Sequence, residues 1–369
     1  MVRSANRINA DLYYCISYYQ VYIAVIKSLL SQKDNVLILS DAIPDVENLQ
    51  KKINKSNIFV NTYILFEKDQ VAFSRTKFRQ EYNRHGNLVK FLIGKSLWLK
   101  SQKAIISHAK SVLLIDVRKF QDIYVFGEGR SFAPYLHNIR KKFILVEDAL
   151  NYYQRRKEDD LIEINRMSKP RKFYLVNKLL DVLGLYYYMG GYSSAVKKIE
   201  VNDKSNLVFV KCAARKLTEL NRKELTNQLT EEQRKLIFDT FMGDEEVSIC
   251  SSDSCVVFTN PLVFDKLVDG EIQAKKIYAE LIKRHCPEKN IYIKPHPRDS
   301  VDYSELVIEG KNIVQIQALL PSEIFMFNRE LRFERALALS STAIDQATFA
   351  RERINLGMNE FKKIKKEIL

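Results

Sequence analysis

The chain has 369 residues, which suits one or two domains, and its 46% hydrophobic and 28% charged residues are typical of a globular protein rather than a disordered one. Its 59 Lys and Arg exceed its 45 Asp and Glu by 14, so we expect an anionic partner: nucleic acid, acidic lipid, or a phosphate- or carboxylate-bearing substrate. No apolar run in the sequence approaches the roughly 20 residues that a transmembrane helix needs. The sequence also lacks the continuous apolar core of a secretory signal. With five widely spaced cysteines, we expect a soluble cytoplasmic protein with reduced thiols.

The first 150 residues alternate short apolar runs with amphipathic stretches. Apolar strands separated by helices are typical of a parallel sheet covered on both faces, so this part predicts a Rossmann-like, doubly wound unit. The first predicted helix is Tyr18–Leu30. The predicted strands are Asp11–Ser17, Asn35–Ser40, Ser111–Ile115, Asp122–Phe126 and Phe143–Val146.

The pattern changes between residues 151 and 244, where a charged run and Pro170 interrupt the alternation. Tyr174–Met189 has the apolar spacing of a helix, and Thr230–Phe241 begins with a Thr-x-x-Gln capping box. We therefore expect a helical middle segment that extends the first domain.

The alternation of strands and helices then resumes and predicts a second Rossmann-like unit. We expect an α/β protein with domains at residues 1–244 and 245–345. The carboxyl ends of both sheets should face a central cleft, and a basic helix over 346–369 should pack back on the first domain. The predicted strands are Ser254–Thr259, Asn290–Lys294, Asn312–Gln315 and Leu337–Ser340, and the predicted helices Gly270–Cys286, Pro321–Phe327 and Asp345–Leu369.

His296 directly follows a predicted strand, in the sequence Lys-Pro-His-Pro-Arg-Asp. Prolines on both sides restrict the backbone, and Lys294 and Arg298 place two cations beside the imidazole. This setting favours hydrogen bonding to a phosphate group over an incidental histidine in a turn.

Two further strand ends in the same half carry groups that suit a nucleotide. Glu323 follows Pro321 and Ser322, so it either caps a helix or accepts hydrogen bonds from a ribose diol. Ser340, Ser341 and Thr342 either cap a helix or bind a phosphate at its amino-terminal end.

In the first half, Glu147 and Asp148 follow the apolar strand Phe143–Val146. A carboxylate at that strand end either begins a helix or acts as a general base. The sequence has no Asp-x-Asp pair, GxxxxGK[ST] loop, GxSxG elbow or HExxH motif. Its basic residues are not interleaved with aromatic ones as in a nucleic-acid module, so we expect no nucleic-acid partner.

These motifs follow one another as VEDALNYY, TNPL after a strand, KPHPRD, LPSEI and SSTA. In this order they resemble the bacterial sialyltransferases of the GT-B fold, and most closely glycosyltransferase family 52, which makes lipooligosaccharide and capsule. The resemblance covers most of the chain. It implies metal-independent, inverting transfer of sialic acid from CMP-sialic acid to a glycan hydroxyl, such as the terminal galactose of a bacterial surface polysaccharide.

The resemblance also implies roles for individual residues. Asp148 would deprotonate the acceptor hydroxyl with support from Glu147, and His296 would stabilise the departing CMP phosphate. Ala149 departs from the family, which has glycine there. The residues expected to bind the nucleotide are Lys294 and Pro295 at the cytosine, Glu323 at the ribose, and Ser340, Ser341 and Thr342 at the phosphate.

CMP is a monophosphate leaving group, so hydrogen-bond donors neutralise it without a metal, and we expect no metal or cofactor. Three alternatives stay open: transfer of another sugar, a CDP-polyol phosphotransferase of the teichoic-acid type, and a non-enzymatic binder. The basic carboxyl-terminal helix is also compatible with peripheral contact to the anionic inner face of the cell membrane. The oligomeric state is left open, with a homodimer as one option.

Overall fold

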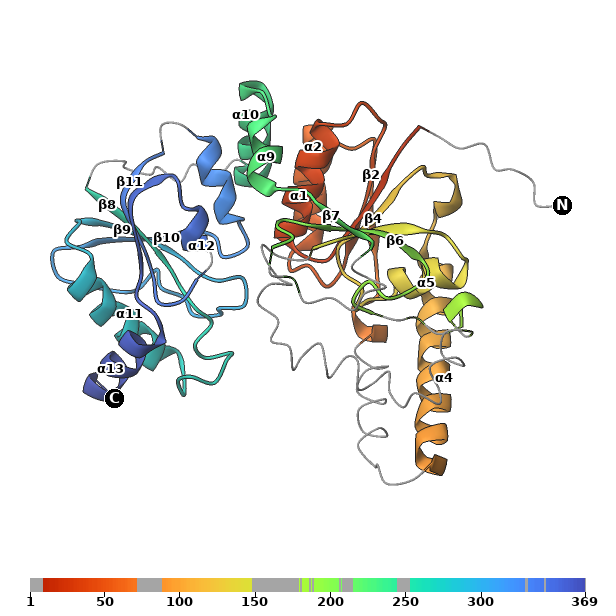
Figure 1. Ribbon diagram of the computed structural model, residues 1–369. Coiled ribbons are helices and arrows are strands. Elements are labelled where there is room, and N and C mark those ends of the chain that lie inside the picture. The colour runs from red at the N-terminus through yellow and green to blue at the C-terminus, as the bar shows by residue number, and fades with distance from the viewer. Residues whose placement is uncertain are drawn as a thin grey trace. The chain divides into compact units, whose positions relative to one another are not determined.

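The apolar strand patterns fold into two separate parallel sheets, which divide the chain into units of residues 1–229 and 230–369 (Figure 1). The predicted α/β class and the two predicted Rossmann-like units are confirmed. In this computed structural model the described residues are 9–71, 88–147, 179, 181–185, 187, 189–205, 207, 215–243, 253–328, 331–341 and 343–368. In this part of the chain, no helix has both the length and the apolar character needed to cross a membrane.

The first unit contains a seven-stranded sheet in the order β3-β2-β1-β4-β5-β6-β7, in which each neighbouring pair is parallel. Its strands are β1 (Leu12–Cys15), β2 (Val36–Ser40), β3 (Asn61–Leu65), β4 (Ile123–Val125), β5 (Phe143–Val146), β6 (Val196–Val201) and β7 (Leu217–Glu219). Its helices are α1 (Tyr18–Leu29), α2 (Val46–Ser56), α4 (Leu88–Val112), the 3-10 helix η1 (Val117–Lys119), α5 (Phe132–Asn138) and α9 (Arg222–Asn227).

The local sequence accounts for α1. The Ser17 hydroxyl accepts a hydrogen bond from the Gln20 amide at 3.3 Å and caps the helix, and the apolar residues that follow are buried. In the last turn, the Lys27 ammonium contacts the Glu200 carboxylate at 2.8 Å, which connects α1 to β6. The predicted helix at Tyr18–Leu30 is confirmed to within one residue.

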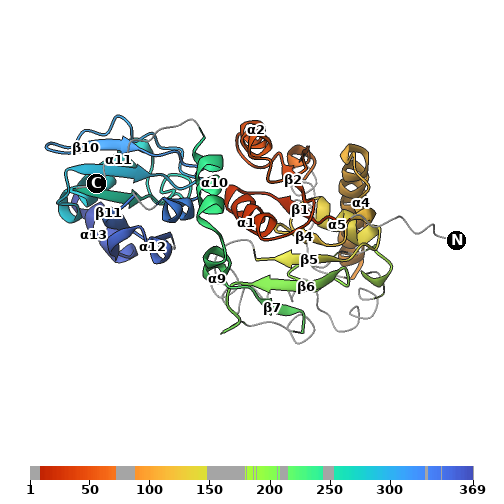
Figure 2. The same cartoon turned by 90° about the horizontal axis from the view of Figure 1, so that it is seen from above.

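Two predictions for the first unit are wrong. Ser111–Ile115 is not a strand: α4 runs to Val112, and the apolar residues after it pack on the core, apart from Leu114, which is 87% exposed. The middle segment is not purely helical either, because β6 and β7 extend the sheet beyond β5 (Figure 2). Lys197 and Lys198 interrupt the apolar pattern of β6, so the sequence pattern did not predict this strand.

The second unit contains a five-stranded parallel sheet in the order β10-β9-β8-β11-β12. Its strands are β8 (Ser254–Phe258), β9 (Asn290–Lys294), β10 (Asn312–Gln315), β11 (Phe333–Ala338) and β12 (Ala350–Asn355). Its helices are α10 (Glu231–Met242), α11 (Glu271–His285), the 3-10 helix η2 (Ser322–Phe327), α12 (Ala343–Gln346) and α13 (Met358–Ile368). The capping box at Thr230 is confirmed. Since α10 packs against η2, the second unit begins before residue 244.

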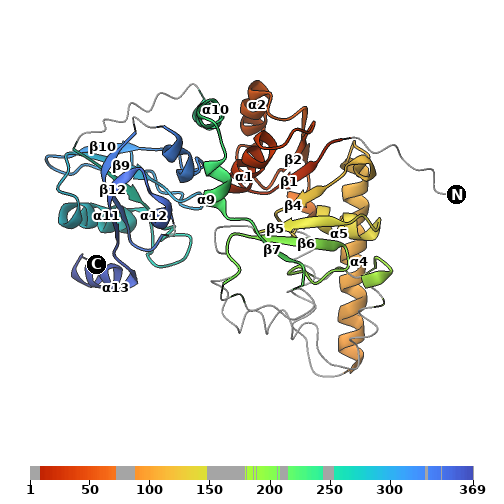
Figure 3. The same cartoon turned by 45° about the horizontal axis from the view of Figure 1, so that its top comes forward.

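The predicted helix over Asp345–Leu369 is wrong. Residues 350–355 form β12 beside β11, and only the end of the segment is helical. This helix, α13, packs against α11 within the second unit (Figures 1 and 3), whereas the sequence predicted packing on the first domain. Its apolar residues Phe361 and Ile364 are buried there, and Glu367 forms an ion pair with Arg284 at 2.5 Å.

Because Phe361 is a core residue, we expect Phe361→Ala to destabilise the second unit by about 3–5 kcal/mol, and Lys362→Ala on the exposed face by less than about 0.5 kcal/mol. Urea unfolding followed by circular dichroism measures the change. Trp98, the single tryptophan, lies in α4 of the first unit, so its fluorescence transition should shift less. Equal losses in the two variants would contradict the packing of α13.

Candidate functional site

The carboxyl ends of β8, β9 and β11 lie along one edge of the second sheet. After β8, the chain adds β9 and then β10 on one side of β8, whereas β11 pairs with β8 on its other side. The direction in which strands are added therefore reverses between β8 and β11. In open parallel sheets, ligands bind outside the strand ends at such a reversal point. The segments at this edge are Thr259-Asn260, Pro295-His296 and Ser340-Ser341, which follow the three strands.

Asn260 bridges the reversal point. Its side-chain amide donates to the carbonyl of Ser340 at 2.7 Å, and its side-chain oxygen accepts from the amide of Ser340 at 3.3 Å. The Asn260 backbone amide donates to the Tyr278 hydroxyl at 2.5 Å. Sequence reasoning assigned no role to Asn260, although it belongs to the TNPL motif.

The His296 loop is attached to β8 through one hydroxyl group. The Thr259 hydroxyl accepts from the His296 amide at 3.1 Å and donates to the buried Asp299 carboxylate. The same carboxylate accepts from the Tyr303 hydroxyl at 3.0 Å, and the Asp299 amide donates to the His296 carbonyl at 2.7 Å. These contacts fix the backbone on both sides of His296.

The ring of His296 has a defined tautomer. Its Nδ1 accepts a hydrogen bond from the Arg298 amide at 3.0 Å, so in the neutral ring the proton is on Nε2. Burial, and then the cations Arg298 and Lys294, lower the pKa of His296 to about 4, against the opposing charge of Asp265. At neutral pH the ring is therefore an uncharged donor through Nε2.

Lys294 is buried, and its ammonium donates to the carbonyls of Pro295 at 3.0 Å and Ala318 at 2.8 Å. Burial lowers its pKa to about 7, although the Glu323 carboxylate opposes this change. Lys294 thus connects the loops after β9 and β10 and places a positive charge near the His296 ring. Glu323 lies in the first turn of η2, and burial raises its pKa.

Asp265 is a carboxylate beside His296 that sequence reasoning missed. It lies 3.8 Å from the Arg298 guanidinium, and its charge acts on the His296 ring. The Arg298 guanidinium lies 5.1 Å from the centroid of the Phe264 ring, which is 61% exposed. The loop after β8 therefore brings an acid and an aromatic ring to the Arg298 cation of the loop after β9.

The serines after β11 only partly match their prediction. The Ser341 hydroxyl accepts from the Ala343 amide at 3.3 Å, which is the predicted capping contact, but α12 is a single turn. Ser340 is exposed at the strand end. Thr342 lies outside the described residues.

In the first unit, Glu147 follows β5 and is buried. Its carboxylate accepts from the Asn202 amide at 2.7 Å, and its own amide donates to the Glu200 carbonyl at 2.9 Å, so it joins the ends of β5 and β6. Asp148 and Ala149 lie outside the described residues, so the prediction of a base at Asp148 stays a prediction.

Glu67 is a second buried carboxylate at the corresponding edge of the first sheet, and sequence reasoning missed it. It accepts hydrogen bonds from the hydroxyls of Tyr14, Ser40 and Ser131 and from the Ser131 amide at 2.8 Å. These donors come from β1, β2 and the loop after β4. Because both of its oxygens are occupied, Glu67 holds this edge in place rather than offering a free carboxylate.

A protein-family model described as glycosyltransferase family 52 matches residues 61–354 of this chain. An uncharacterized protein of Haemophilus influenzae is 26% identical over 229 residues, which cover 61% of this chain and 65% of that protein. The match thus spans somewhat less than two thirds of that relative.

Solved structures are also similar, at low identity. The UDP-N-acetylglucosamine 2-epimerase of Rickettsia bellii matches 93% of this chain and 76% of its own, with 11% identity and a TM-score of 0.46. The corresponding epimerase of Methanocaldococcus jannaschii matches 92% and 80%, with 13% identity and a TM-score of 0.45. CalG4, the calicheamicin glycosyltransferase, matches 92% and 76%, with 8% identity and a TM-score of 0.46.

The electrostatics of His296 are open to a direct test. We expect its ring to titrate near pH 4 by NMR, with the signal assigned from His296→Gln, and Arg298→Gln to raise this midpoint because a nearby cation is removed. Since the folded-state pKa lies below the ordinary 6.5, His296 reduces stability as the pH falls from about 6.5 toward 4. A midpoint near 6.5 in the unsubstituted protein would contradict the described environment.

Proposed function

The chain belongs to glycosyltransferase family 52, and from this premise we propose that it transfers sialic acid from CMP-sialic acid to a glycan hydroxyl, with inversion and without a catalytic metal. In this reaction the acceptor oxygen forms a bond to the anomeric carbon while the bond from that carbon to the phosphate oxygen breaks. A base takes the hydroxyl proton, and CMP leaves with the electron pair of the broken bond.

The observation that carries this proposal is the environment of His296. Its Nε2–H lies at the carboxyl edge of the second sheet, after β9, and two cations, Lys294 and Arg298, act on its ring. A neutral imidazole donor near positive charge suits a phosphate oxygen on which negative charge develops. We therefore assign His296 to stabilising the departing CMP.

We place the nucleotide along the same edge. Ser340 and Ser341, with Thr342, would contact the phosphate, and Glu323 would accept hydrogen bonds from the ribose. Pro295 would line the cytosine pocket. Lys294 would contribute there through its charge and through the loops it joins, because its ammonium already donates to two carbonyls.

Two carboxylates are candidates for the base. Asp148, supported by Glu147, is the residue that the sequence motif favours. Asp265 is a described carboxylate whose charge reaches His296, and it is exposed in the loop after β8. In an inverting transfer the base acts on the face of the anomeric carbon opposite the departing phosphate, so Asp265 can serve as the base only where the sugar lies between it and His296.

We also propose that any contact with an anionic membrane surface is electrostatic. Lys362, Lys363 and Lys366 are exposed on α13, whereas the apolar residues Phe361 and Ile364 are buried in the second unit. The helix therefore offers charge to a lipid surface without an apolar face to insert.

A donor screen tests the proposed reaction. We expect CMP release from CMP-sialic acid with a galactose-terminated acceptor, and a loss of about 10²–10³ in kcat for His296→Ala. CDP-glycerol, CDP-ribitol and UDP-sugars serve as comparison donors. Turnover of a CDP-polyol, with phosphate left on the acceptor, would instead establish a phosphotransferase.

Two matched substitutions identify the base. Asp148→Asn and Asp265→Asn each remove one carboxylate with little change in size, and we expect the true base variant to lose about 10²–10⁴ in kcat. CMP binding, measured by calorimetry, should persist in both. If both variants keep full turnover, neither carboxylate is the base.

A further inference from the structure

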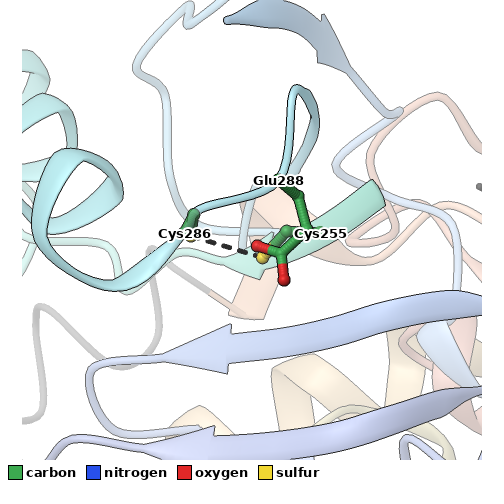
Figure 4. Close-up of side chains that lie close together, drawn as sticks. All are labelled: Cys255, Cys286 and Glu288. Carbon is green, nitrogen blue, oxygen red and sulfur yellow. Dashed lines mark hydrogen bonds between the residues drawn. The ribbon is translucent and has the colours of Figure 1, made fainter. Parts of the chain in front are cut away.

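A separate cluster of metal-ligating groups lies in the second unit. Cys255 is in β8, Cys286 caps the carboxyl end of α11, and Glu288 lies in the turn before β9 (Figure 4). The two sulfur atoms are 3.3 Å apart, and one ligand atom from each of the three residues lies within 4.8 Å of the others. All three are buried, with exposures of 0%, 2% and 6%.

One atom of this cluster has no hydrogen-bond partner. Oε1 of Glu288 accepts from the Arg335 guanidinium at 3.0 Å, but the buried Oε2 accepts from no group. A buried carboxylate oxygen without a partner destabilises the folded state, and a bound cation or a hydrogen-bond donor removes this cost. Oxidation of the two thiols to a disulfide would leave Oε2 in the same state.

We propose that Cys255, Cys286 and Glu288 bind one thiophilic divalent metal ion, of which Zn²⁺ is the representative. Thiolate and carboxylate oxygen are both ligands of zinc, and the three side chains fill three of its four tetrahedral positions, with one left for water. Two thiolates and one carboxylate carry three negative charges, and Arg335, which contacts the carboxylate, also pairs with Glu352 at 2.9 Å. A divalent ion neutralises two of the three charges.

The turn that carries two of the ligands is already fixed. The Lys311 ammonium donates to the carbonyls of Cys286 at 2.7 Å, Pro287 at 2.9 Å and Glu288 at 2.7 Å. Arg335, besides holding Glu288, donates to the carbonyl of His285 at 3.0 Å. Such outer contacts orient metal ligands and reduce the reorganisation that binding requires.

The metal ion would be structural rather than catalytic. Cys255 is near the beginning of β8, whereas Thr259 follows the end of the strand, and the four strand steps between them span roughly 13 Å. The ion would join β8, α11 and the turn before β9 at the edge opposite the proposed nucleotide site. This inference does not depend on the proposed function.

The test uses the full chain, purified with and without a chelator. We expect one Zn²⁺ per chain by elemental analysis, and Cd²⁺ should give the ultraviolet absorption of a metal–thiolate bond. In competition with a chromophoric chelator, the double variant Cys255→Ser, Cys286→Ser should bind Zn²⁺ at least 100-fold more weakly, and Glu288→Gln about tenfold more weakly. Cys15→Ser, at a buried cysteine of the first unit, is the matched control and should keep full affinity.

Measurements on the unsubstituted protein decide the question even if a variant does not fold. Zn²⁺ should raise its Tm, and chelation should lower it. The proposal is overturned if this protein binds no metal, if it is isolated with a Cys255–Cys286 disulfide in mass spectra, or if either cluster variant binds as tightly as the control.

Discussion

The candidate site of the second unit depends on the hydroxyl group of Thr259. This one group accepts the His296 amide and donates to the buried Asp299 carboxylate, so it couples the end of β8 to the loop after β9. Parallel strands bring their carboxyl ends to one edge but leave the loops beyond them free to differ. The Thr259–Asp299 contact removes that freedom on one side of β8, and the Asn260–Ser340 pair removes it on the other.

Much of the fold follows from local patterns in the sequence. The apolar run Phe143–Val146 is the strand predicted, and the capping box at Thr230 begins a helix, because each signal lies within a few residues of the element it specifies. These local patterns do not predict an element correctly where contacts between distant parts of the chain determine its structure. β6 is a strand despite Lys197 and Lys198, because neighbouring strands pair with its backbone on both sides.

Parts of the candidate site likewise follow from local sequence, and other parts do not. The restricted, cationic environment of His296 was predictable because two prolines and two cations surround it in the sequence. Asn260 and its partner Ser340 are 80 positions apart, and the sulfur atoms of Cys255 and Cys286 meet across 31 positions. Asp265 acts on His296 only because the loop after β8 turns toward the loop after β9. Contacts of this kind arise from the sheet order, which local periodicity does not reveal.

The late position of β12 and α13 in the sequence has a consequence for synthesis on the ribosome. The edge of the second sheet and part of its core are supplied by residues 350–355 and by Phe361 and Ile364. Segments from residue 230 onward therefore emerge before the strand and helix that cover them. The first unit, which ends at residue 229, needs none of these late residues for its sheet. Its folding can thus precede that of the second unit, whose apolar strands stay exposed to other chains and to chaperones for longer.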